Sequence, residues 1–168
     1  MIIVSHKNVA GKYECDLKQT ASDALVAVSK MPKPVILFSG PISTGGFGSV
    51  ADNIECLLSF ISESSKRGIS VFNQIVYEKR LDCILKDHKD YDYPLLNYFY
   101  KPILESGKIN GLVFLPLWQS SIGSTWEHNF ATSIGIPIFY SEYMLVEEIQ
   151  KFYSNLKNDN LAQKNKKG

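Results

Sequence analysis

The chain has 168 residues, of which 45% are hydrophobic and 21% are charged, so it fits one globular domain and leaves no room for a second. Its 18 basic and 17 acidic residues give a formal net charge of +1, which excludes an overall field that would attract a nucleic acid polymer or a membrane surface. Three widely spaced cysteines without a Cys-x-x-Cys pair argue against a disulfide framework or a zinc site. No apolar run approaches the length of a membrane span, and we expect a cytoplasmic protein that needs no metal or other cofactor.

The first 33 residues are predicted to form an N-terminal extension that packs on the core. Apolar side chains recur at helical spacing between residues 17 and 28, and the sequence Met-Pro-Lys-Pro then ends this helix. The five apolar positions of this helix are Leu17, Ala21, Ala24, Leu25 and Val28.

Residues 34–156 follow a different pattern, in which strands alternate with helices. The predicted strands are residues 35–39, 69–77, 109–117 and 136–140, and the predicted helices are residues 49–68, 93–108 (interrupted by Pro102), about 124–134, and 143–156. This alternation predicts an α/β fold with a doubly wound, mostly parallel sheet, Rossmann-like or flavodoxin-like, with helices on both faces. The polar residues 157–168 carry four lysines and little to bury, and we expect them to form a flexible basic tail.

A glycine-rich loop, "SGPISTGGFGS" (residues 39–49), follows the first of these strands and opens a helix. Glycines let backbone amides approach an anion closely, and a helix N-terminus adds partial positive charge, so the loop is a candidate phosphate site. It is neither a P-loop nor a GxGxxG fingerprint. Taken alone, the loop fits a flexible connection equally well. Its place at the carboxyl end of a strand, where such sheets bind ligands, favours a binding role.

A second loop, "LWQSSIGS" (residues 117–124), leads to Glu127. The sequence "STWE" matches a capping box, in which Ser124 is the N-cap and Glu127 reaches back to the N-cap amide. In the other interpretation Glu127 is a reactive carboxylate, because a first-turn carboxylate at this edge of the sheet would face the cleft. Such a carboxylate can stabilise and then trap the oxocarbenium-like state through which an N-glycosidic bond breaks.

The segments "FSGPIS", "VFNQ" and above all "LPLWQSSIGSTWEHNFATSIGIPI" resemble the nucleoside 2-deoxyribosyltransferase-like superfamily, which includes deoxyribosyltransferases and nucleoside 5′-monophosphate N-glycosidases. The resemblance covers residues 34–142. It implies that Glu127 is the nucleophile that attacks the anomeric carbon and expels the base. It also implies that the glycine-rich loop lines the sugar and phosphate side of the site.

The residue at position 121 helps to predict whether the substrate carries a phosphate. Family members that act on free nucleosides are similar to one another in carrying an aspartate at this position, whereas the monophosphate hydrolases have a serine. A serine can donate a hydrogen bond to a phosphate that an aspartate would repel, so Ser121 favours a nucleoside 5′-monophosphate; the neighbouring Ser120 is the other candidate for this position. Asn73 and Gln74 could contact a base edge, or they are ordinary polar groups at a strand end.

Two positions depart from the family pattern. The aspartate that the resemblance implies before the third strand is Asn110 here, and the second acidic residue of the preceding helix has no clear equivalent near Tyr100. With Glu127 as the catalytic residue, the predicted substrate-binding residues are Ser39, Gly40, Pro41, Ile42, Gly45, Gly46, Asn73, Trp118, Ser120, Ser121, Gly123 and Ser124.

These observations favour a nucleoside 5′-monophosphate N-glycosidase, with hydrolysis preferred over transfer. A nucleoside 2-deoxyribosyltransferase is the second candidate, and a non-catalytic nucleotide sensor that uses the same pocket is the third. The aromatic run "YDYPLLNYFY" (residues 91–100) carries more apolar surface than a small monomer usually exposes, so we also expect a homodimer or larger assembly.

Overall fold

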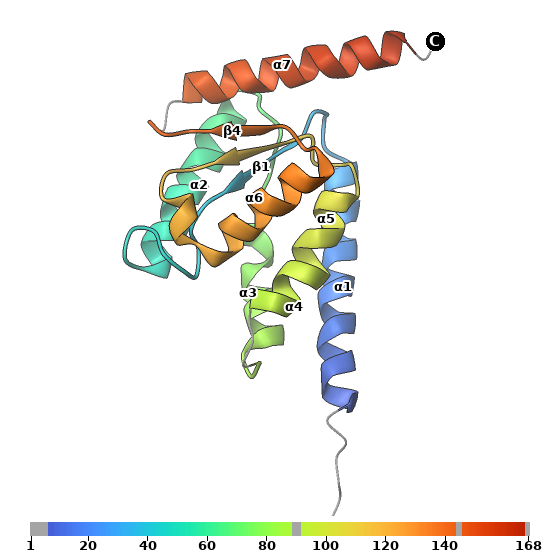
Figure 1. Cartoon of the computed structure of the whole chain (residues 1–168), viewed down its shortest axis with the longest axis vertical. Helices are drawn as coiled ribbons and strands as arrows, with labels where there is room; N and C mark the ends of the chain where they lie inside the picture. The colour runs from blue at the N-terminus through green and yellow to red at the C-terminus, as the bar shows by residue number, and fades with distance from the viewer. Residues whose placement is uncertain (1–6, 89–91, 144–145, 167–168) are drawn as a thin grey trace, which may run out of the picture.

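The computed structural model describes residues 7–88, 92–143 and 146–166 of the chain. The strands are β1 (Ile36–Ser39), β2 (Val71–Phe72), β3 (Gly111–Phe114) and β4 (Ile138–Tyr140). The helices are α1 (Lys7–Ser29), α2 (Val50–Lys66), α3 (Ile75–Leu85), α4 (Asp92–Leu95), α5 (Lys101–Glu105), α6 (Ile122–Ile134) and α7 (Val146–Asn165), with a π-helical turn η1 (Leu96–Tyr100) and a 3-10 turn η2 (Trp118–Ser120) (Figure 1).

The four strands form one parallel sheet in the order β2-β1-β3-β4. Leu37 of β1 lies in register with Phe72 on one side and with Leu112 on the other. Helices cover both faces of this sheet, so the predicted doubly wound α/β fold is confirmed.

Side chains alternate between the two faces along the strands, as a pleated strand requires. Ile36 and Phe38 pack with α2 and α7 on one face, whereas Leu37 packs with α1, α3 and the α4–η1–α5 segment on the other. Because every residue of β1 and β3 is buried, both strands read as continuous apolar runs in the sequence.

Helix α1 belongs to the larger of the two core clusters. It buries four of its five predicted apolar positions completely, namely Leu17, Ala21, Ala24 and Val28. An ion pair of 2.6 Å between Asp23 and Arg80 also joins α1 to α3.

The strand predicted at residues 69–77 is wrong in its second half. Only Val71–Phe72 pair with β1, and the chain turns into α3 at Ile75. The Asn73 side chain accepts a hydrogen bond of 3.0 Å from the Ile75 amide, which holds the first turn of α3. The apolar run of residues 69–77 therefore spans a strand and a helix, and periodicity alone does not separate the two.

The predicted interruption at Pro102 is a change of helix type: Pro102 lies in the first turn of α5, directly after a π-helical turn. Proline lacks an amide hydrogen and its ring displaces the carbonyl four residues earlier, so a regular α-helix cannot run through this point. The chain accommodates it by widening residues 96–100 into a π-helical turn before α5 begins with Pro102 in its first turn. This turn directs Leu96 and Tyr100 towards the carboxyl edge of the sheet.

The buried face of α2 is rotated relative to the apolar stripe that helical spacing predicts in this segment, namely Val50, Ile54, Leu57, Leu58 and Ile61. Leu57 and Ile61 are buried, but Val50 is 49% and Leu58 is 37% exposed. The polar residue Asn53 takes an inward position instead, where it binds the glycine-rich loop.

Helix α7 continues to Asn165 rather than ending near residue 156, where we expected a flexible tail to begin. No glycine or proline interrupts residues 157–167, so nothing in the local sequence ends the helix earlier. Helical spacing predicts one apolar stripe of Leu145, Ile149, Phe152 and Leu156 in this segment. Ile149 and Leu156 are buried and Phe152 is half-buried, whereas Leu145 lies outside the described residues.

The strand order reverses between β1 and β3, because the chain first moves from β1 to β2 and then crosses back to β3 on the other side. Open α/β sheets bind ligands beyond the carboxyl ends of their strands at such a switch point. Both loops singled out in the sequence leave the sheet at this point.

Candidate active site

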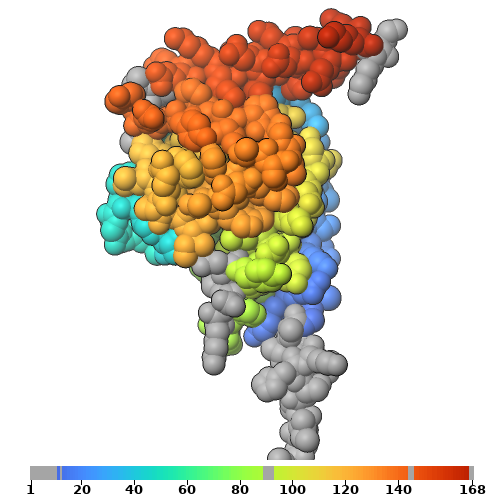
Figure 2. Space-filling view, in the orientation of Figure 1, coloured from blue at the N-terminus to red at the C-terminus, as the bar shows by residue number. Residues whose placement is uncertain are grey.

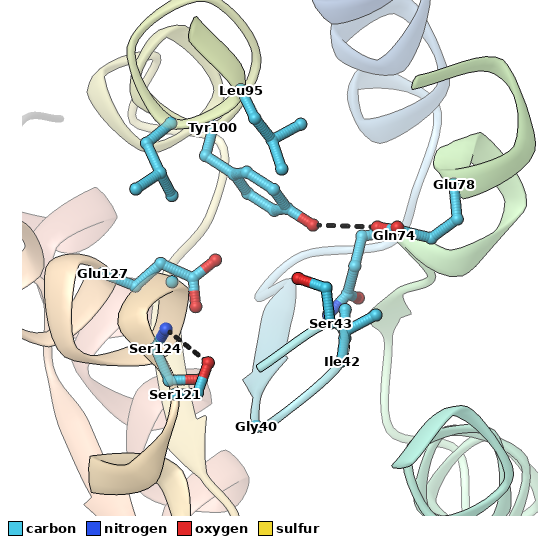
Figure 3. Close-up of a pocket in the computed structure, with 12 residues that line it drawn as sticks. Gly40, Ile42, Ser43, Gln74, Glu78, Leu95, Tyr100, Ser121, Ser124 and Glu127 are labelled. Atoms are coloured by element: carbon cyan, nitrogen blue, oxygen red, sulfur yellow. Dashed lines mark hydrogen bonds between the residues drawn. The ribbon is translucent and has the colours of Figure 1, made fainter. Parts of the chain in front are cut away.

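A pocket lies at the switch point, between the segment after β1 and the N-terminal half of α6 (Figure 3). It contains about 500 Å³ of empty space, including solvent at its mouth. Its lining is Gly40, Ile42, Ser43, Gln74, Glu78, Leu95, Leu96, Tyr100, Ser121, Gly123, Ser124 and Glu127. The lining combines two carboxyl groups with hydroxyls, one amide and apolar side chains, and it includes no lysine or arginine among the residues that the structure describes.

Glu127 is not part of a capping box. Helix α6 begins at Ile122, and its N-cap is Ser121, whose side-chain oxygen accepts a hydrogen bond of 3.3 Å from the Ser124 amide. The helix therefore starts earlier than the sequence pattern indicated, and Glu127 lies in its second turn, too far along to reach the N-cap amide. Its carboxyl group points into the pocket and is buried.

The Glu127 carboxyl group is bound by Ser39, the last residue of β1. The Ser39 hydroxyl donates a hydrogen bond to Oε2 of Glu127, and both side chains are buried. Burial raises the pKa of Glu127 to about 7, the Ser39 bond opposes this shift, and the negative charge of Glu78 adds to it. Ser39 therefore contacts the carboxyl group rather than the open part of the pocket.

Glu78 is a second carboxyl group in the pocket, and sequence analysis missed it. It projects from α3 on the wall opposite Glu127, with the Tyr100 ring between them (Figure 3). The Tyr100 hydroxyl donates a hydrogen bond of 3.4 Å to Glu78. Burial raises the pKa of Glu78 to about 7, the charge of Asp82 adds to the increase, and the Tyr100 bond lowers it.

Gln74, rather than Asn73, lines the pocket. Its Nε2 donates a hydrogen bond of 2.7 Å to the Phe38 carbonyl, which fixes the orientation of the amide. Its Oε1 is buried without a partner among the described residues. Gln74 and Glu78 are four residues apart at the start of α3 and so share one face. The spacing Gln-x-x-x-Glu could have revealed this pair if residues 75–77 had been assigned to a helix.

The glycine-rich loop is closed by its own hydrogen bonds. The Gly46 amide donates to Oγ of Ser120 over 2.9 Å, and the Phe47 amide donates to Oδ1 of Asn53 over 2.9 Å. Gly45 and Gly46 have positive φ angles of 67° and 81°. A Cβ atom on Gly46 would lie 2.2 Å from Oδ1 of Asn53, so this glycine permits close packing of the loop.

Three of the predicted loop residues, Pro41, Gly45 and Gly46, consequently do not line the pocket, whereas Gly40 and Ile42 do. The candidate phosphate site therefore includes only part of the glycine-rich loop. It comprises Ser43 and the start of α6, where Ser121, Gly123 and Ser124 line the pocket and the Ser124 hydroxyl is buried without a partner among the described residues.

Trp118 and Ser120 also lie outside this pocket. The Trp118 ring stacks on His128 with centroids 4.6 Å apart and borders a separate hollow beside Tyr140. Ser120 binds the glycine-rich loop, and the Thr44 hydroxyl accepts a hydrogen bond of 3.0 Å from the Ile122 amide. These two bonds fix the loop after β1 to the N-terminus of α6.

Asn110 lies at the other end of the sheet from the pocket. Its Oδ1 accepts a hydrogen bond of 2.8 Å from the Val35 amide, just before β1 begins. Asn110 therefore joins the segments that lead into β1 and β3, and it is not among the residues that line the pocket.

Comparison of the chain with protein-family models, curated proteins and solved structures gives no match. Among the residues that the structure describes, no helix is long and apolar enough to cross a membrane. Within the same part of the chain, no three His, Cys, Asp or Glu side chains are grouped so that they could hold a metal ion.

Replacing Glu127 with glutamine should stabilise the fold at high pH. The folded protein keeps the Glu127 proton up to a pKa of about 7, against 4.5 for an ordinary glutamate, so stability falls as the pH rises between these two values. Glutamine removes this loss, and the variant should gain up to about 3 kcal/mol over the wild type at about pH 8 and much less at about pH 5. Urea unfolding at the two pH values measures the difference. Glu55→Gln, on the exposed surface of α2, is the matched control, and an equal change in both variants would contradict the account.

Proposed function

We propose that this protein hydrolyses the N-glycosidic bond of a nucleoside 5′-monophosphate, with Glu127 as the nucleophile. The observation that carries the proposal is the position of Glu127: a buried carboxyl group in a pocket at the switch point, oriented by Ser39 and opposed by a second carboxyl group on Glu78. Most enzymes that hydrolyse glycosidic bonds use two carboxyl groups, one on each side of the bond that breaks.

In the first step the Glu127 carboxylate attacks the anomeric carbon and the carbon–nitrogen bond breaks. The bonding electrons pass to the base, which takes a proton from Glu78. In the second step Glu78, now ionised, removes a proton from water, and the hydroxide attacks the anomeric carbon and releases Glu127. Sugar phosphate and free base are the products, and both carboxyl groups return to their starting state.

The two walls of the pocket suit different parts of the substrate. The hydroxyls of Ser43, Ser121 and Ser124 and the first turn of α6 suit a phosphate, which would be held by hydroxyl groups and a helix N-terminus without a basic side chain. The opposite wall suits a base, because Leu95 and Leu96 offer apolar contacts and Gln74 presents an unpaired acceptor.

The Glu127→Gln variant should lose turnover by orders of magnitude while it still folds and binds nucleotide. A neutral amide neither attacks the anomeric carbon nor offsets positive charge in the transition state. The assay is chromatography of free base released from a panel of nucleosides and their 5′-monophosphates. Near-normal release by the folded variant would end this mechanism. Release from nucleosides alone, only when an acceptor base is present, would favour a deoxyribosyltransferase; nucleotide binding without any release would favour a sensor.

Ser121→Asp should abolish the preference for monophosphates without unfolding α6. Aspartate is as good an N-cap as serine, so the helix start is preserved, but its charge repels a phosphate held at that turn. The ratio of kcat/KM for a nucleotide to that for its nucleoside should fall at least about tenfold, a loss of about 1.4 kcal/mol. Ser121→Asn keeps the cap without the charge and is the control. An unchanged ratio in Ser121→Asp would remove the phosphate from this end of the pocket.

The rate of base release should be bell-shaped against pH, with its maximum near neutrality. Attack requires ionised Glu127 and departure of the base requires protonated Glu78, and the pKa of each group is about 7. Activity is therefore lost at acidic pH as Glu127 gains its proton and at alkaline pH as Glu78 loses its proton. Because the two charges interact, the two apparent pKa values of the profile describe the pair of carboxyl groups and not each group separately. A rate that rises with pH to a plateau would show that Glu78 is not the acid. Glu78→Gln should remove the alkaline limb.

A further inference from the structure

Strand β4 forms one edge of the sheet and pairs only with β3 among the described residues. Two hydrogen bonds fix which of its backbone groups face β3. The Leu112 amide donates to the Pro137 carbonyl, and the Ser141 amide donates to the Phe114 carbonyl, each over 2.9 Å. Because a strand alternates, the amides and carbonyls of Ile138 and Tyr140 point away from the sheet.

This edge strand is short, with three residues, but it carries no charge or proline of the kind that usually keeps an edge strand from pairing. The three residues are Ile138, Phe139 and Tyr140. Tyr140 is 45% exposed, and Tyr143, just beyond the strand, is 76% exposed. The edge therefore offers unpaired backbone groups next to accessible apolar side chains.

A groove runs between β4 and α7, and it contains about 860 Å³ of empty space including open solvent. It is lined by Phe139, Tyr140, Glu142, Tyr143, Glu148, Lys151, Phe152 and Asn155. Figure 1 shows α7 running above β4, and in Figure 2 the same helix forms a ridge above the orange surface of α6 and β4. Glu148 and Lys151, three residues apart on α7, present opposite charges to the groove, and neither forms an ion pair among the described residues.

We propose that this edge binds a second copy of the chain, through antiparallel pairing of the two β4 strands about a two-fold axis at Phe139. In that register Ile138 of each copy lies opposite Tyr140 of the other. Directly opposed residues with outward-facing backbone groups exchange two hydrogen bonds, so the two pairs satisfy all the open amides and carbonyls of both strands. The contact is self-complementary and closed, as a two-fold dimer requires.

The charges on α7 favour a second copy over an unrelated strand. A two-fold axis at the sheet edge places the α7 helices of both copies on the same face, side by side and antiparallel. Glu148 of one copy then faces Lys151 of the other, and the reverse pair forms by symmetry. An unrelated peptide could use the backbone groups of β4, but nothing would provide it with this charge pattern.

The interface proposed here differs from the one that the aromatic run of residues 91–100 suggested. Leu95, Leu96, Phe99 and Tyr100 are buried in the core, although Tyr93 is 64% exposed and Tyr91 lies outside the described residues. Most of that apolar surface is therefore already covered within one chain.

Charge reversal on α7 tests the proposal with the full-length chain. Lys151→Glu and Glu148→Lys should each raise the dimer dissociation constant at least about tenfold, because each places like charges across the axis. The double variant restores opposite charges and should return close to the wild-type constant. Sedimentation velocity across a wide concentration range measures all of them. Lys164→Glu makes the same charge change at the far end of α7, outside the groove, and should have no effect.

Hydrogen exchange tests the strand pairing on the wild type, without depending on a variant. The amides of Ile138 and Tyr140 should exchange more slowly as the protein concentration rises, whereas the Phe139 amide, which faces β3, should not respond. A wild type that stays monomeric at every accessible concentration would overturn the proposal. So would a dimer in which the double variant is no tighter than the single ones, or in which the Ile138 and Tyr140 amides stay unprotected.

Discussion

The contact between Ser39 and Glu127 is the interaction on which the site depends. It joins the end of β1 to the second turn of α6, and it holds a carboxyl group in a buried position where ionisation is unfavourable. A fold under selection for stability alone would place an apolar residue there. The carboxyl group is tolerated because the β1–β3 pairing brings Ser39 to the same edge of the sheet from which α6 starts.

The loops around this contact hold its two sides in place through their own hydrogen bonds. The Gly46 amide binds Ser120, the Ile122 amide binds Thr44, and Asn53 donates to the carbonyls of Ile42 and Gly45. A reacting carboxylate must be held within a fraction of an ångström by the groups behind it. In the proposed mechanism the glycine-rich loop has that supporting role, and the hydroxyl groups at the start of α6 would contact the phosphate.

The fold could be predicted from the sequence because each strand of the sheet is short, apolar and followed by a helix. Glu127 could also be found, since it follows a strand end and a cluster of small polar residues. Glu78 could not, and Gln74 could not be told apart from Asn73 as a pocket residue, because residues 75–77 fit a strand as well as a helix until the hydrogen bond from the Ile75 amide to Asn73 is known. The roles of Gly46 and Ser120 were equally hidden, because the hydrogen bond between them joins residues 74 apart in the chain, which no local pattern encodes.

The most direct test is to look for the covalent intermediate. A nucleoside 5′-monophosphate bearing fluorine at C2 of the sugar slows both steps by destabilising the oxocarbenium-like state, so the glycosyl-enzyme should accumulate. Acid quenching, proteolysis and mass spectrometry should find the sugar phosphate attached to Glu127, with one equivalent of free base released, and should find no adduct on the Glu127→Gln variant. Release of base by the wild type without any adduct, or an adduct on a residue other than Glu127, would contradict the account.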